Sequence, residues 1–168
     1  AGVGMLQALG FSFLDENNQE VGYGGNVLKK ICTIDVSGVH QTIKDCTFKI
    51  ACDVSNPLYG KNGAAYIFGP QKGATTEMVE ELNAGLKHFA EVTFREQNRD
   101  IQNIKGAGAA GGLGAAFAGF LDAHLLSGVQ LLLETVEIEE KKKGVDIVIT
   151  GEGKLDGQTS MGKAPLGI

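Results

Sequence analysis

Near its carboxyl end, the chain carries a short apolar segment that runs directly into a loop rich in glycine and polar groups. Residues 145–150 are almost entirely apolar and β-branched, which is typical of a strand buried on both faces in a parallel sheet. The loop at residues 151–160 holds two carboxylates, an ammonium and two hydroxyls. In open α/β sheets, ligands bind beyond the carboxyl ends of such strands. The sequence therefore predicts an α/β fold with its chemistry at this strand end.

The rest of the hydrophobic pattern alternates strands and helices at irregular spacing, which favours a mixed sheet flanked by helices. Strands are expected at residues 11–14, 32–36 and 47–52, and helices at residues 1–10, 26–30, 62–68, 111–126 and 127–136. A longer helix is expected to begin at Thr75 or Thr76. Its apolar face, at helical spacing, includes Val79, Leu82 and Phe89.

Length and composition indicate one globular domain. The chain has 168 residues, 43% of them hydrophobic and 21% charged, which suffices for a core. The net charge of −5 and the absence of a basic face argue against nucleic-acid binding. No apolar run reaches the length of a membrane span, and no signal peptide is visible. The three cysteines form no CxxC pair, so a reducing cytoplasm is the expected location.

Both ends of the chain fall inside predicted helices. The helix at residues 1–10 has no start signal of its own, and residues 162–168 begin another helix that is cut short. Natural domain boundaries rarely lie within an element. We therefore expect residues 1–168 to form a single domain taken from a longer protein.

Glycine is over-represented and clusters in a few loops. There are 25 glycines in 168 residues, about 15% against a usual ~7%. Residues 106–111 satisfy the GxGxxG pattern, but they follow no convincing buried strand, so a dinucleotide fingerprint is a poor match. Two interpretations remain open. Bare N–H groups at a helix start could hold phosphate or carboxylate oxygens, or the glycines could allow close helix packing.

Three other positions carry polar groups with two interpretations each. Asp53 and Asn56 come just after a predicted strand, where they could contact a ligand or simply form a turn before proline. Lys72, in a Gly-Pro-Gln-Lys-Gly segment, could reach an anion or belong to a plain turn.

The loop after the last predicted strand has the strongest chemical pattern. Glu152 and Asp156 lie four residues apart in a glycine-bounded turn, and can converge on one cation or one hydroxyl. Lys154 lies between them as a donor. Carboxylates are suitable ligands for Mg²⁺ and can also accept a proton from an attacking hydroxyl.

Five segments together resemble the type I bacterial glycerate kinase family, in order and over essentially the whole chain. They are residues 4–10, 51–58, 68–74, 106–114 and 149–156. Members of this family are about twice as long as this chain. They insert a second α/β domain into a discontinuous Rossmann-like domain and transfer the γ-phosphoryl group of ATP to D-glycerate. The resemblance implies that this chain is the inserted second domain of a two-domain kinase, with its flanks, and that the Rossmann-like domain is its partner.

The resemblance also implies roles for particular residues. Asp156 would orient or deprotonate the glycerate hydroxyl with Lys154 beside it, and Glu152 and Asp53 would hold Mg²⁺. The expected substrate and phosphate contacts are Asp53, Asn56, Lys72, Gly106, Gly108, Gly111, Gly112, Gly114, Thr150 and Gly151. The alternative is a folding or oligomerisation module whose active site lies in the missing domain, and a homodimer is left open. In either case, the isolated chain is expected to be inactive.

Overall fold

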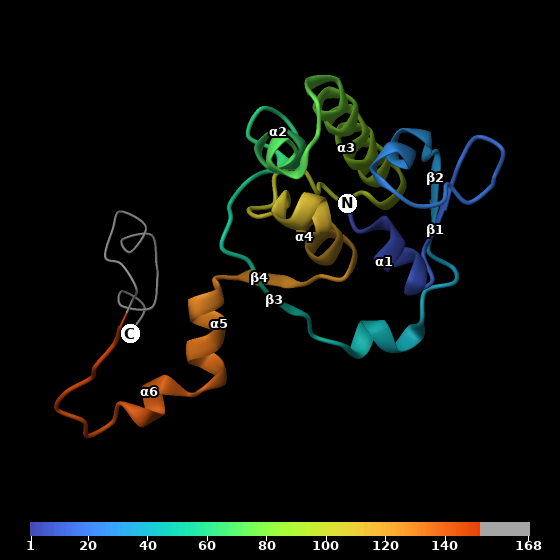
Figure 1. The fold of residues 1–168 in the computed structure, drawn as a ribbon. Helices are drawn as coiled ribbons and strands as arrows, with labels where there is room; N and C mark the ends of the chain where they lie inside the picture. Colours follow the sequence, from blue (N-terminus) through green and yellow to red (C-terminus); the bar gives the residue numbers. More distant parts are fainter. Residues whose placement is uncertain (152–168) are drawn as a thin grey trace.

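Helices and short strands alternate along residues 1–151, the part of the chain that the computed structural model describes (Figure 1). The α-helices are α1 (Val3–Ala8), α2 (Ala64–Phe68), α3 (Thr76–Gln97), α4 (Ala109–Phe120), α5 (Gly128–Thr135) and α6 (Ile138–Lys141). The 3₁₀ helices are η1 (Gly25–Lys30), η2 (Gln41–Asp45) and η3 (Pro70–Lys72). The strands are β1 (Ser12–Leu14), β2 (Thr33–Asp35), β3 (Lys49–Ala51) and β4 (His124–Leu126). The predicted mixture of helices and strands is confirmed.

The strands within residues 1–151 form two small sheets. Strands β1 and β2 pair antiparallel with Phe13 opposite Ile34, whereas β3 and β4 pair in parallel with Ile50 opposite Leu125. The parallel pair brings together segments that are more than seventy residues apart in the sequence. Within residues 1–151, the predicted mixed sheet is therefore wrong: one antiparallel pair and one separate parallel pair form, and the parallel pair consists of β3 and β4.

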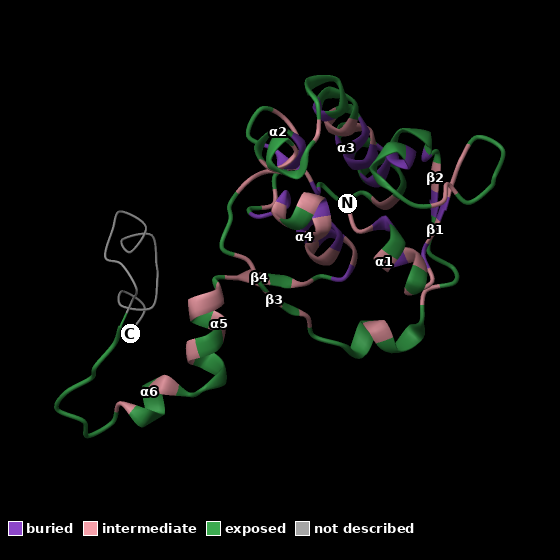
Figure 2. Ribbon diagram, in the orientation of Figure 1, coloured by how far each residue is buried: buried purple, intermediate pink, exposed green. Residues whose placement is uncertain are grey.

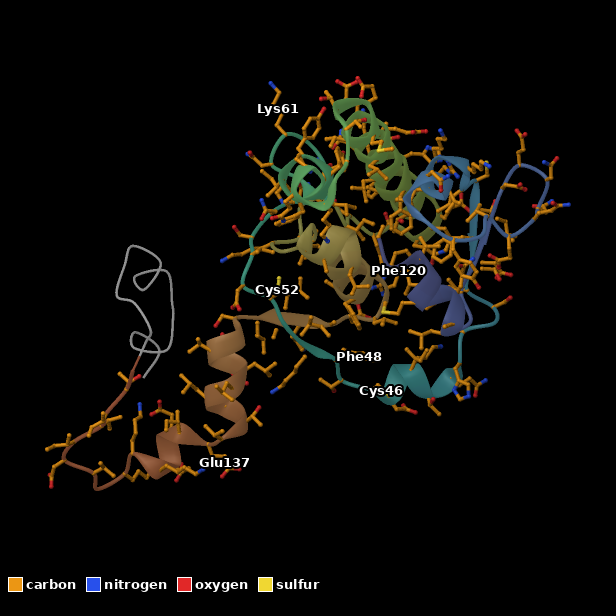
Figure 3. All side chains as sticks on the ribbon, viewed as in Figure 1. Cys46, Phe48, Cys52, Lys61, Phe120 and Glu137 are labelled. Atoms are coloured by element: carbon orange, nitrogen blue, oxygen red, sulfur yellow. The ribbon has the colours of Figure 1, made fainter. Side chains whose placement is uncertain are left out.

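The core lies between α3, α4, α1 and the β1–β2 pair, which carry buried residues (Figure 2). Its centre consists of aromatic rings. Phe13 and Phe89 are fully buried. The ring of Phe120 lies 5.5–6.1 Å, between centroids, from the rings of Phe11, Phe13 and Phe89 (Figure 3). Aromatic pairs at these separations stabilise a core beyond the area that they bury. This cluster joins the first strand to the two longest helices.

Helix α3 begins where the sequence predicts. The Thr75 hydroxyl oxygen accepts a hydrogen bond from the Met78 N–H at 3.3 Å, so Thr75 is the N-cap. The helix ends at Asn98, which adopts a left-handed conformation with φ of 52°. The predicted apolar residues Val79 and Phe89 are buried, which confirms the amphipathic pattern.

The predicted strand at residues 145–150 is not formed. The segment has no strand assignment and is exposed, with 91% of Ile149 and 75% of Ile147 open to solvent. A strand needs a neighbour for its backbone groups and for its faces. No other segment of residues 1–151 supplies that neighbour, so the apolar pattern alone was insufficient.

The predicted helix over residues 111–126 was also wrong at its carboxyl end. Helix α4 stops at Phe120, and Asp122 turns the chain with a positive φ of 50°. His124 then donates its backbone N–H to the Phe48 carbonyl at 2.9 Å, which starts the pairing of β4 with β3. Tertiary pairing therefore overrode the helical preference of this segment.

The carboxyl-terminal helices extend away from the body formed by α1 to α4 (Figure 1). Helix α5 carries no buried residue, although Leu132 and several neighbours are apolar. Within residues 1–151, no helix is long and apolar enough to cross a bilayer.

Candidate functional site

A cavity of about 350 Å³ opens between the body helices. Its walls come from η1, α2, the η3 turn, the first turns of α3 and the start of α4. The lining residues are Ala1, Gly25, Leu28, Ala64, Ala65, Phe68, Gly69, Lys72, Gly73, Ala74, Met78, Leu82, Leu86 and Gly111. Of these side chains, only Lys72 carries a charge.

The position of Lys72 follows from a tight turn. Pro70 begins η3, and its fixed φ suits the first position of a helix. Gly73 ends the turn with φ of +89°, a conformation that other residues rarely adopt. The Gly73 N–H donates to the Pro70 carbonyl at 3.0 Å, and the Ala74 N–H donates to the Gly69 carbonyl at 3.1 Å. These bonds hold the backbone that places Lys72 at the cavity wall.

The start of α4 also contributes to the wall of the cavity. Ala110, Gly111 and Gly112 have φ of 49°, 72° and 96°, so the first turn is left-handed. The N–H groups of Ala110 and Gly111 donate to no oxygen of residues 1–151. Successive unpaired N–H groups in such a turn can bind an anion. Gly111 and Lys72 line the same cavity.

The other predicted glycines lie in tight packing. An added Cβ at Gly106, Gly108, Gly112 or Gly114 would lie 2.8, 2.3, 2.9 or 2.1 Å from its nearest heavy atom. An added Cβ at Gly111 would meet nothing within 4 Å. The two interpretations of this motif therefore apply at different positions: close packing describes four glycines, and only Gly111 faces open space. Direct anion binding by any of the five stays a prediction.

Asp53 and Asn56 face other segments and do not line the cavity. One Asp53 carboxylate oxygen accepts a hydrogen bond from the Gly128 N–H at 2.8 Å, at the positive end of α5. The Asn56 side chain donates to the Asn62 carbonyl at 2.9 Å, and the Asn56 carbonyl accepts from the Gly108 N–H at 2.9 Å. Asn56 thus joins its loop to the glycine segment.

The remaining predicted site residues lie at the end of residues 1–151 or outside that range. Thr150 and Gly151 are exposed. Glu152, Lys154 and Asp156 lie outside the described residues. Among residues 1–151, no three His, Cys, Asp or Glu side chains gather as a metal site.

The apolar wall of the cavity was missed at the level of sequence. Met78, Leu82 and Leu86 follow one another at four-residue spacing on α3 and line the cavity, and Phe68 lines it from α2. Met78 is 53% exposed, which is unusual for a large apolar side chain. The four-residue spacing of these α3 side chains was the available signal in the sequence, but the same spacing is typical of a helix face that packs into a core.

Comparison with known proteins places the whole chain in one group. The model of the glycerate kinase family matches residues 1–168. The chain is 47% identical to glycerate 2-kinase of Escherichia coli K12 and 48% identical to glycerate kinase of Halalkalibacterium halodurans, each over 167 residues. A crystal structure assigned to glycerate kinase 2 of Salmonella typhimurium LT2 matches with a TM-score of 0.91 and 43% identity. In all three comparisons, the match covers 99% of this chain and 44% of the other protein.

Proposed function

Because the chain belongs to the glycerate kinase family, we propose that it is the inserted domain, with its flanks, of a two-domain enzyme. That enzyme transfers the γ-phosphoryl group of ATP to D-glycerate. The chain spans 44% of the length of its relatives, which leaves room for a Rossmann-like domain of the same protein. The active site would then lie between the two domains.

One observation carries this proposal: Lys72 and Gly111, far apart in the sequence, line the same cavity. Phosphoryl transfer depends mainly on positioning and on neutralising the charge of phosphate oxygens. The Lys72 ammonium supplies a point charge, and the unpaired N–H of Gly111 supplies a directed donor. Together they fit an anionic oxygen of a substrate.

The carboxylates of the chain fit the metal that this chemistry uses. Mg²⁺, when bound with ATP, neutralises charge on the phosphate oxygens. One Asp53 carboxylate oxygen accepts the Gly128 N–H, and its other oxygen has no hydrogen-bond partner within residues 1–151. Glu152 is the second candidate ligand, and carboxylate oxygens are the protein ligands that Mg²⁺ prefers. We assign to Asp156, with Lys154 beside it, the task of orienting or deprotonating the glycerate hydroxyl.

The exposed apolar carboxyl-terminal region supports a contact with the missing domain. Val145, Ile147, Val148 and Ile149 are apolar and open to solvent, and α5 buries none of its residues. Exposed apolar surface of this extent is typical of a region that another domain covers. Under this proposal, residues 145–150 become a strand only when the Rossmann-like domain supplies a neighbouring strand.

The test removes, in the full-length protein, the one charged side chain that residues 1–151 contribute to the cavity wall. We expect Lys72→Met to lower kcat/KM for ATP-dependent glycerate phosphorylation by at least about tenfold, or ~1.4 kcal/mol. Lys61→Met is the matched control, because Lys61 is exposed on a neighbouring loop and points away from the body (Figure 3). The measurement is the rate of ADP formation with and without D-glycerate.

Two results would count against the proposal. If the wild-type protein forms no phosphoglycerate, the activity is wrong. If Lys72→Met and Lys61→Met have the same kcat/KM as wild type, the cavity is not the site. Calorimetric titration of the full-length protein with glycerate and with Mg-ATP distinguishes a substrate site from a folding or oligomerisation module. If the domain is only such a module, Lys72→Met should leave both affinities unchanged.

A further inference from the structure

The wall of the cavity is unsuited to a small hydroxy acid. Leu28, Phe68, Met78 and Leu82 present aliphatic, aromatic and thioether surface. Every carbon of glycerate bears an oxygen, so this substrate has no apolar face to bury. Polar groups placed against such a surface without hydrogen bonds cost free energy. The wall therefore requires a ligand that has an apolar face of its own.

We propose that this cavity is the nucleotide subsite, with the purine base of ATP against the apolar wall and the phosphates at Lys72 and Gly111. The identity of the nucleotide rests on the proposed function. Under this assignment, the Lys72 ammonium binds a phosphate of ATP and does not bind the carboxylate of glycerate. The sequence had left both of these anions open. Glycerate then binds elsewhere in the inter-domain cleft.

The volume of the cavity agrees with this assignment. Pockets for small-molecule ligands and cofactors measure roughly 300–1,000 Å³, and this cavity, at about 350 Å³, lies in that range. A three-carbon acid would leave most of it empty. A purine base is flat, with two apolar faces and a polar edge, and fills such a space with apolar contacts.

The composition of the wall also agrees with a flat ring. Met78 carries a polarisable sulfur, and sulfur contacts with aromatic rings are favourable. Phe68, on α2, can contact a ring face or edge. Lys72 and Gly111 lie on η3 and α4, so the groups that suit phosphate come from elements other than α3, which supplies Met78, Leu82 and Leu86.

The first test fills the cavity without changing its charge. Ala74 lines the cavity, and Ala74→Leu in the full-length protein adds three carbons to its wall. We expect KM for ATP to rise about tenfold while KM for glycerate stays within about twofold. Ala84→Leu is the matched control, because Ala84 is exposed on α3 and is not among the residues that line this cavity. It should leave both constants unchanged.

A second variant covers the case in which Ala74→Leu does not fold. Met78 is 53% exposed and lies in the first turn of α3, where a carboxylate suits the helix dipole. Met78→Glu should therefore fold, and should raise KM for ATP by removing the apolar contact with the base. Met78→Leu, which keeps an apolar side chain at this position, should leave KM for ATP near the wild-type value, and KM for glycerate should stay within about twofold in both variants.

The outcomes separate the subsite from the overall activity. A rise in KM for glycerate with unchanged KM for ATP would assign the cavity to glycerate, and unchanged constants would exclude it as a ligand site. An equal rise in both constants would also overturn the proposal. If the wild-type protein does not phosphorylate glycerate, calorimetry with ADP decides instead. Loss of ADP affinity in Ala74→Leu but not in Ala84→Leu then supports the nucleotide subsite, and equal affinity refutes it.

Discussion

Replacement of Gly114 by alanine tests whether the glycine segment serves close packing. Gly114 lies inside α4, where glycine is ordinarily unfavourable, and a change to alanine normally stabilises a helix by about 0.5–1 kcal/mol. Here the added Cβ would lie 2.1 Å from the Gly106 carbonyl oxygen and 3.4 Å from the Ala107 Cα. These are backbone atoms, so no side chain can rotate out of the way.

The size of the effect follows from the shift that the new contact requires. Real Cβ contacts essentially never fall below 3.0 Å, so the backbone at Gly106 must move by roughly 1 Å from its 2.1 Å position. The same carbonyl accepts the Ala109 N–H at 2.9 Å, and this bond would lengthen. Overpacking costs about 1–3 kcal/mol and a lost hydrogen bond about 1 kcal/mol. After the gain in helix propensity, we expect a net loss of about 1–3.5 kcal/mol.

The assay is thermal unfolding of the full-length protein by scanning calorimetry, with Gly4→Ala as the control. Gly4 lies in α1, and its added Cβ would make an ordinary 3.4 Å contact with the Tyr23 ring. We expect Gly4→Ala to raise Tm slightly and Gly114→Ala to lower it by several degrees. A Gly114→Ala protein as stable as the Gly4→Ala protein would refute the packing argument for this segment.

Two further predictions concern α3 and an ion pair. Thr75→Ala removes the N-cap of α3 and should lower the free energy of unfolding by about 1 kcal/mol. Thr76→Ala leaves the cap in place and should change it little. Equal Tm values for the two variants would contradict the capping role. The Arg99 guanidinium donates to Asp122 at 2.6 Å and holds the pKa of that carboxyl below its ordinary value. The stabilisation is therefore present above the unfolded pKa of about 4 and is lost as pH falls through the lower folded pKa. Because the pair is largely exposed, Asp122→Asn should lower stability by no more than about 1 kcal/mol at pH 7 and by less at pH 3; a larger deficit at pH 3 would show that the sign is wrong.

The sequence predicted best where the physical cause is local. The start of α3 depends on one hydroxyl and an N–H three residues away, and its buried face depends on helical spacing. The helix before Gly69 and Pro70 also ends as expected, because proline suits a new turn and not the continuation of α2. Such short-range rules need no knowledge of distant neighbours.

The candidate site was predicted only in part, because its members meet through distant contacts. Lys72 and Gly111 were both singled out from their glycine-rich surroundings, but nothing in the pattern indicated that they share a cavity. The stripe through Met78 and Leu82 has the spacing of an ordinary core face, so its role as a cavity wall could not be distinguished. Asp53 faces the start of α5, a segment seventy-five residues away.

By itself, the sequence determined the mixture of helices and strands, the N-terminal cap of the long helix and the family to which the chain belongs. Only the tertiary structure decided which glycines pack and which one faces open space, since identical residues in one short motif have different neighbours. Residues 145–150 also depended on the tertiary structure. Their largely apolar, β-branched composition favours a strand, but a strand forms only where another segment completes its hydrogen bonds. Residues 1–151 contain no such partner for it.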